Sequence, residues 1–134
     1  MSDGDTITVL DASKVQHKVR LAGIDAPEKG QAFGNRSKEN LSRLAFDKTV
    51  AAHCHKKDRY GWAVCKVMRG ATDANLEQVR AGMAWWYREY AKEQSPEDRV
   101  SYAVAEEHAR AGRIGLWKDA KPVPPWEWRM RPPR

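Results

Sequence analysis

Apolar and polar residues alternate over several short stretches of the chain, which is typical of β-strands. Five segments have this pattern and are rich in β-branched or aromatic residues: residues 6–10, 15–24, 49–55, 61–68 and 83–90. A polar turn at residues 11–14 separates the first two segments, and another at residues 57–60 separates the next two. We therefore expect two hairpins, followed by an extended aromatic segment.

Helical periodicity predicts three helices, over residues 35–46, 75–80 and 95–111. The last has clear signals at both ends. Ser95 is a suitable N-cap, Pro96 fits the first helical position, and Gly112 should end the helix.

Residues 121–134 contain five of the seven prolines of the chain. We expect this segment to form a polyproline-like tail that is not helical, with Trp126 and Trp128 as candidate anchors. The chain is thus divided into one folded domain, residues 1–120, and a Pro/Trp-rich C-terminal tail, residues 121–134.

About five short strands, together with about three helices, favour an α+β fold built on a small five-stranded Greek-key β-barrel of the OB type. Composition alone does not select this barrel over another α+β arrangement. A length of 134 residues and a hydrophobic share of 41% suit one globular domain.

The chain has 24 Lys and Arg against 18 Asp and Glu, a net charge of +6 and a pI near 9.5. Such a balance favours a polyanionic partner, although it also serves solubility. No apolar run approaches the roughly 20 residues of a membrane span, and nothing in the sequence indicates a protein partner. The chain opens on polar residues, so we expect a trimmed or mature form without a signal peptide.

Several charged residues lie at the ends of predicted strands. Asp3-Gly-Asp5 opens the first strand, Asp25 closes the second, and Arg20 and Glu28 flank Asp25 in sequence. If the first hairpin pairs as expected, Asp5 and Asp25 meet at one end of the sheet. Two carboxylates with carbonyl and water oxygens suit Ca²⁺, although Asp-Gly by itself is more often a turn.

Five blocks of the sequence together resemble the staphylococcal nuclease family in order and spacing: Asp3-Gly-Asp-Thr6, Val19-Arg-Leu-Ala-Gly-Ile-Asp-Ala-Pro-Glu28, Asp58-Arg-Tyr-Gly61, Asn75-Leu-Glu-Gln-Val-Arg-Ala-Gly82 and Gly115-Leu-Trp117. The resemblance covers most of the chain. It implies an OB-fold, calcium-dependent phosphodiesterase that acts on DNA and RNA.

The resemblance also implies a role for each matching residue. Asp5 and Asp25 correspond to calcium carboxylates, and the carbonyl of Ala26 to a backbone ligand. Glu28 corresponds to the residue that activates or positions the attacking water, and Arg20 to a phosphate clamp. These roles agree with the chemistry of phosphodiester hydrolysis, which needs positive charge at the phosphoryl oxygens and a base near water.

The aromatic positions allow more than one role, and one of them departs from the family. Tyr60 and Tyr90 resemble tyrosines that line the nucleotide site, although either could be structural. Trp62 stands where the family has a second catalytic arginine, and an indole cannot clamp a phosphate. Arg59 or Lys57 could reach the phosphate instead.

Trp62 could also stack on a base. Two functions therefore remain open: a nuclease of reduced efficiency, or a catalytically silent OB module that binds single-stranded nucleic acid. In both cases we expect DNA or RNA, preferably single-stranded or denatured, as the partner.

The two cysteines allow two kinds of site. His53-Cys-His55 with Cys65 suggests zinc, but strand alternation places Cys54 on the opposite face from the two histidines. Folding the second hairpin about its turn places Cys54 opposite Cys65, so we expect a disulfide, with two buried thiols as the alternative. Exported members of the family look similar here, which favours a periplasmic or secreted bacterial protein.

Overall fold

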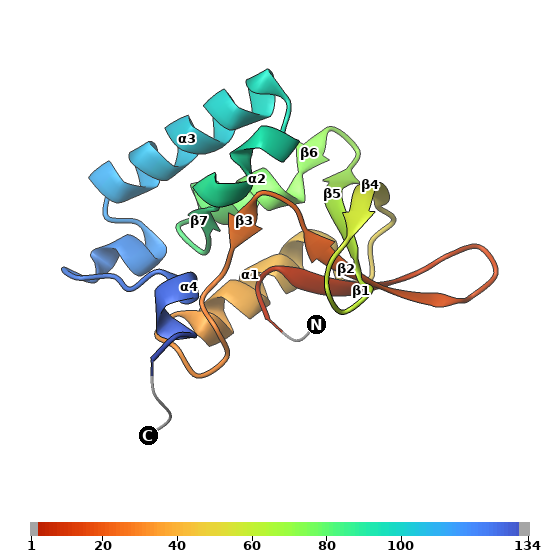
Figure 1. Cartoon of the computed structure of the whole chain (residues 1–134), viewed down its shortest axis with the longest axis horizontal. Coiled ribbons are helices and arrows are strands. Elements are labelled where there is room, and N and C mark those ends of the chain that lie inside the picture. Colours follow the sequence, from red (N-terminus) through yellow and green to blue (C-terminus); the bar gives the residue numbers. More distant parts are fainter. Residues whose placement is uncertain (1–2, 132–134) are drawn as a thin grey trace.

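A mixed sheet forms the centre of the structure, a computed structural model that describes residues 3–131 (Figure 1). Its strands are β1 (Thr6–Leu10), β2 (Gln16–Leu21), β4 (Ala51–Lys57), β5 (Ala63–Arg69) and β6 (Thr72–Asp73). The strand order is β1-β2-β5-β4, with β6 paired to β5. Neighbouring strands are antiparallel except β2 and β5, which run parallel.

A second sheet has only two strands, β3 (Ile24–Asp25) and β7 (Trp85–Trp86), which pair antiparallel. Within the described part of the chain, no strand pairing closes either sheet into a barrel. The predicted α+β class is therefore confirmed, and the closed five-stranded barrel stays a prediction.

The helices are α1 (Gly34–Ala45), α2 (Ala74–Arg80), α3 (Pro96–Ala111) and α4 (Pro125–Trp128), with 3₁₀ helices at Arg88–Glu93 and Gly115–Lys118. The three predicted helices are confirmed to within one residue at each end. In α3 the predicted cap is present, because the Ser95 hydroxyl accepts a hydrogen bond from the Asp98 backbone N–H at 3.1 Å. No helix among residues 3–131 is long and apolar enough to cross a membrane.

Apolar residues from the strands and from α1, α2 and α3 form the main core. Among its members are Val19, Leu21, Ile24, Leu41, Val67, Val79 and Tyr102, all almost fully buried. The β1–β2 hairpin extends away from this core, on the side of the molecule opposite α4 (Figure 1). The residues that end β2 and begin β1 nevertheless lie at its base, against the core.

Two predicted strands are shorter than expected. Residues 15–24 are broken after Leu21 by a turn in which Gly23 has a φ of +79°, a conformation that favours glycine. Residues 83–90 form a strand only at Trp85–Trp86, because the partner β3 has just two residues, and the chain then turns into the 3₁₀ helix at Arg88–Glu93.

The predicted tail is wrong in one respect, since Pro125–Trp128 is a helical turn. Proline is compatible with the first turn of a helix, where its missing N–H has no helical partner. The Trp126 ring stacks on Tyr87 at 5.2 Å between centroids and meets the edge of Trp85 at 5.4 Å. Trp126 is therefore an anchor, as predicted, and it holds the C-terminal segment against β7.

Candidate active site

The turn that carries Asp5 is held in place by two helices. A Cβ on Gly4 would lie 1.7 Å from the Ser37 hydroxyl of α1, so only glycine allows this approach. The Gln78 side chain of α2 donates a hydrogen bond to the Gly4 carbonyl at 2.7 Å. On the strand side, the Leu21 N–H donates to the Asp5 carbonyl at 2.8 Å. The Asp5 carboxylate therefore has a fixed position at the start of β1.

Asp25 and Glu28 belong to the segment that leaves β3. The Asp25 side chain is fully buried, and the Ala26 N–H donates to the Asp5 carboxylate at 2.9 Å, which joins this segment to the start of β1. The chain then passes close to α1, because a Cβ on Gly34 would lie 2.0 Å from the Glu28 carbonyl oxygen. Close packing against α1 thus positions the loop that carries Glu28.

Arg20 projects from β2 between the two aspartates. Its Nη2 lies 3.9 Å from Asp5 Oδ2 and 3.7 Å from Asp25 Oδ1, and its side chain is 29% exposed. Asp5 and Asp25, which were expected to meet at one end of the sheet, thus lie on either side of the same guanidinium group. Their guanidinium and carboxylate groups share one partly buried site.

The electrostatics of this site favour additional positive charge. Burial raises the pKa of Asp5 well above its ordinary value, and the neighbouring Asp3 raises it further. Burial also raises the pKa of Asp25. Burial lowers the pKa of Arg20, but the charges of Asp5 and Asp25 outweigh this and raise it overall. Both carboxylates would be stabilised as anions by a nearby cation.

The oxygen donors at this site suit a hard cation such as Ca²⁺. The donors that the structure brings together are the carboxylates of Asp5 and Asp25, and the family resemblance assigns the carbonyl of Ala26 as a further ligand. Among residues 3–131 no group of three or more His, Cys, Asp or Glu side chains could hold a metal ion together. A calcium ion here would therefore need the backbone carbonyl and water in addition to the two carboxylates. The zinc alternative near His53 finds no support in this part of the chain.

Sequence reasoning missed Arg129, which follows α4 and reaches the same carboxylates. Its Nη1 lies 3.1 Å from Asp25 Oδ1 and its Nη2 lies 2.7 Å from Asp25 Oδ2. Nη1 also donates to the Glu28 carboxylate. These hydrogen bonds raise the pKa of Arg129, since they stabilise its charged form. The only sequence signal was the pair of tryptophans that anchor the segment.

Tyr60 and Trp62 lie together at the turn between β4 and β5, with ring centroids 5.3 Å apart. Lys18 Nζ lies 4.5 Å from the centre of the Trp62 ring. The Arg59 guanidinium lies over the Tyr60 ring and donates to its hydroxyl at 2.9 Å. Within the described chain, neither Arg59 nor Lys57 forms an ion pair with the carboxylates of the site.

Tyr90 is exposed and packs against residues other than Tyr60 and Trp62. Its ring meets the edge of Tyr87 at 4.9 Å, and Lys56 Nζ lies 4.5 Å from its centre. Tyr87 is closer to the charged site, since burial and then the charges of Glu89 and Asp25 raise its pKa to about 12. Tyr87 was not singled out from the sequence, where nothing distinguished it from other aromatic residues.

The predicted disulfide between Cys54 and Cys65 is present. The two residues are directly opposite each other in the β4–β5 pairing. Cys65 is fully buried, whereas Cys54 lies on the exposed strand β4. The bridge therefore connects the outer strand of the sheet to the core.

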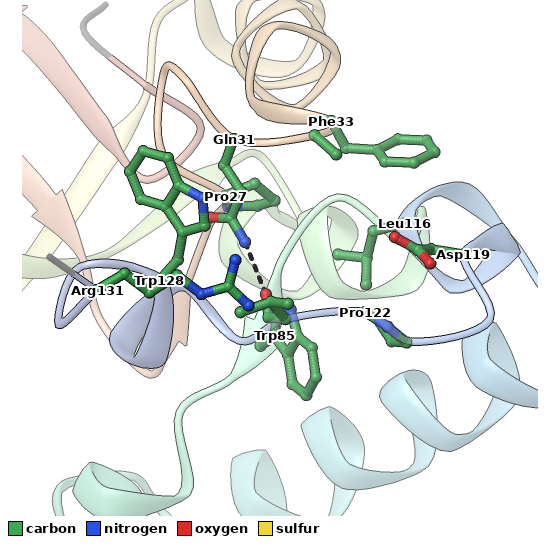
Figure 2. A pocket seen from close by; sticks show the side chains of 11 residues that line it. Pro27, Gln31, Phe33, Trp85, Leu116, Asp119, Pro122, Trp128 and Arg131 are labelled. Carbon is green, nitrogen blue, oxygen red and sulfur yellow. Dashed lines mark hydrogen bonds between the residues drawn. The ribbon is translucent and has the colours of Figure 1, made fainter. Parts of the chain in front are cut away.

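A cavity of about 160 Å³ lies between the Glu28 loop and the C-terminal segment (Figure 2). Pro27 and Gln31 line it from the loop, and Trp128 and Arg131 line it from the end of α4 and beyond. The Gln31 side chain donates to the Val123 carbonyl at 2.7 Å, across the cavity. The C-terminal segment thus supports the loop that carries Glu28.

Comparison with known proteins shows which family the chain is similar to. The sequence model of the family described as "Staphylococcal nuclease homologue" matches residues 18–119. The chain is 45% identical over 131 residues to an "Uncharacterized endonuclease" of Haemophilus influenzae, covering 98% of this chain and 70% of that protein. It is 43% identical over 136 residues to a "Micrococcal nuclease" of Shigella flexneri, covering 95% of this chain and 75% of that protein.

Proposed function

The chain belongs to the staphylococcal nuclease homologue family, and we propose that it is a calcium-dependent nuclease that hydrolyses phosphodiester bonds in DNA and RNA. The observation that carries this proposal is the position of Arg20, within 4 Å of both Asp5 and Asp25, beside the loop that bears Glu28. We also propose that the sheet belongs to an OB-type barrel, as expected for the family.

In this proposal Asp5, Asp25 and the Ala26 carbonyl hold one Ca²⁺. When bound, Ca²⁺ would act as a Lewis acid on a phosphoryl oxygen. The buried carboxylates are suited to this task because desolvation makes them strong partners for a cation. Their fixed positions also mean that the carboxylates themselves need to move little to bind it.

The remaining roles belong to Arg20 and Glu28. Arg20 donates hydrogen bonds to the phosphoryl oxygens, where negative charge develops during hydrolysis. Glu28 accepts a proton from the attacking water, and its side chain is 26% exposed, so that water can reach it. The Gly34 contact holds the Glu28 backbone in place, which limits the motion of the base relative to Arg20.

We propose that single-stranded nucleic acid is preferred. Tyr60 is 62% exposed and Tyr90 is 43% exposed, and with Trp62 they offer aromatic surfaces on which bases could stack. Base faces are accessible in single strands but not within a duplex. Calcium dependence and strand preference are tested together by the experiment below.

Hydrolysis of denatured and of duplex DNA, and of RNA, should be measured with Ca²⁺ and with a calcium chelator. The proposal expects cleavage only with Ca²⁺ and faster cleavage of denatured DNA. Glu28→Gln, prepared in the same way, is the matched control, since it keeps the shape of the side chain but cannot accept a proton. No cleavage by the wild-type protein with Ca²⁺, or equal cleavage by Glu28→Gln, would contradict the proposal.

We further propose a periplasmic or secreted location in a bacterium. The Cys54–Cys65 disulfide supports this, because such bonds persist in oxidising compartments and are rare in the cytosol. Fractionation of the native host with an antibody to the protein tests it. Recovery of the protein in the cytosolic fraction with free thiols would contradict it.

A further inference from the structure

We propose that Arg129 is a second phosphate-binding arginine of this active site, contributed by the C-terminal segment. This inference rests on the proposed nuclease function and adds a residue to it. It assigns a function to Arg129, which lies outside the sequence blocks that match the family.

Several contacts place Arg129 at the site. Trp126 is stacked on Tyr87 and packed against Trp85, and the Val123 carbonyl is bonded to Gln31. Pro125 is buried at the start of α4, and Arg129 follows the last residue of this helical turn. The side chain of Arg129 is thus directed by anchors on both the core and the Glu28 loop.

The two arginines come from distant parts of the chain and lie near the same oxygen of Asp25. Arg20 lies 3.7 Å from Asp25 Oδ1 and Arg129 lies 3.1 Å from it. Asp25 itself is fully buried, whereas the arginine side chains are 29% and 37% exposed. Because both arginine side chains are partly exposed, a phosphate bound beside Asp25 can reach them from solvent.

The charge balance of the site supports this role. The carboxylates of Asp3, Asp5, Asp25 and Glu28 are set against the guanidinium groups of Arg20 and Arg129. A divalent cation together with both arginines balances these four negative charges, so that a phosphodiester anion is not repelled. Without Arg129 the same cation would leave the cluster net negative, and phosphate binding would be weaker.

The other basic residues near the site are directed elsewhere. Lys18 lies on the Trp62 ring, and Arg59 lies on the Tyr60 ring. Arg129 is the only arginine besides Arg20 that forms an ion pair with Asp5, Asp25 or Glu28 among residues 3–131. It is therefore the residue best placed to supply the charge that is missing at Trp62.

This role has a second consequence for metal binding. Arg129 bonds both oxygens of Asp25, so it competes with a cation for that carboxylate. When substrate and metal bind, its guanidinium must transfer from Asp25 to the phosphate. Removing Arg129 should therefore have opposite effects on two ligands: tighter Ca²⁺ without substrate, and weaker binding of a charged phosphodiester.

Calorimetry of Arg129→Gln tests both effects. The probes are Ca²⁺ alone and, with Ca²⁺ present, two thymidine dinucleotides that resist cleavage: a negatively charged phosphorothioate and an uncharged methylphosphonate. We expect affinity for the phosphorothioate to fall roughly tenfold and affinity for the methylphosphonate to change by less than about threefold. Arg129→Lys should retain part of the phosphorothioate affinity, since it keeps a point charge.

Arg131→Gln is the matched control, because it removes an equal charge two residues away, and Arg131 forms no ion pair in the described chain. It should leave all three affinities almost unchanged.

Equal losses for both dinucleotides in Arg129→Gln would indicate a merely structural role and overturn the proposal. Tighter phosphorothioate binding would show that Arg129 blocks the site, and would overturn it too.

Hydrolysis by the wild-type protein separates this inference from the proposed function. If wild-type protein cleaves DNA with Ca²⁺ and Arg129→Gln binds the phosphorothioate normally, only the role of Arg129 is wrong. If wild-type protein neither cleaves DNA nor binds the phosphorothioate, the proposed function itself is wrong, and the inference falls with it.

Discussion

Removing the Cys54–Cys65 disulfide should lower the free energy of unfolding by about 3 kcal/mol. Cys54→Ser is the suitable variant, because Cys54 lies on an exposed strand and tolerates a hydroxyl. Cys65 is fully buried and should be left in place, since a free buried thiol still fills its space as a small apolar group. The substitution thus removes the covalent bond and leaves the core packing almost intact.

The magnitude follows from the loop that the bridge closes. The two cysteines are separated by 11 residues in sequence. In the chain-entropy model a loop of this size restricts the unfolded chain by about 9 cal/mol/K, or about 2.8 kcal/mol at 25 °C. Native pairing of β4 with β5 holds the same residues together without the bond, so most of the effect should arise in the unfolded state.

Urea denaturation followed by tryptophan fluorescence measures this difference. Oxidised wild-type protein should unfold at a higher urea concentration than Cys54→Ser, and the variant should show a larger m value because its unfolded chain is more expanded. Wild-type protein with a reducing agent should match the variant. Ala52→Ser, another serine on the exposed strand β4, is the control and should change stability by less than about 0.5 kcal/mol.

Two results would refute this reasoning. If oxidised wild-type protein and Cys54→Ser unfold at the same urea concentration, the bridge either does not form or does not restrict the unfolded chain. If Cys54→Ser is much less stable than reduced wild-type protein, the serine itself disturbs β4, and loop closure cannot be the cause of the difference.

Three predictions concern the site. Asp25→Asn should weaken Ca²⁺ binding in calorimetry by at least roughly tenfold, because it removes a charged ligand, and an unchanged affinity would contradict the metal assignment. Glu28→Gln should lower turnover on denatured DNA by roughly 100-fold while phosphorothioate affinity changes little, and unchanged turnover would place the base elsewhere. Trp62→Arg should raise turnover on single-stranded DNA by roughly tenfold in the Arg129→Gln background and by less in the wild type. No gain in either background would show that an arginine at position 62 cannot bind the phosphate.

The elements that could be predicted from the sequence depend on neighbouring residues. The helix α3 has its N-cap, its first-turn proline and its final glycine within one short segment. The β4–β5 hairpin follows from two strands and the turn between them, and its register then places Cys54 opposite Cys65. Arg20 and Asp25 were likewise found because they lie within one compact motif, and the pairing of Thr6 with Arg20 in the first hairpin brings the neighbouring Asp5 to them.

The features that could not be predicted depend on distant partners. The length of β7 is limited by β3, which is about 60 residues earlier in the chain, and nothing local to Trp85 indicates this limit. Helix α4 has only four residues, too few for a periodic pattern. Its position depends on the contact of Trp126 with Tyr87, which is not visible in the sequence.

Arg129 shows why a motif can describe an active site incompletely. A motif of fixed spacing includes only residues that lie close together in sequence. Arg20, Asp25 and Glu28 are such residues, because one strand and the loop after it carry all three. Phosphate binding, however, requires positive charge at a point in space, and any segment that reaches this point can supply it. Arg129 reaches Asp25 across a sequence separation of 104 residues. Because position 62 is a tryptophan, it supplies no positive charge to the site. The site can still have a second arginine, because Arg129 reaches it from the C-terminal segment.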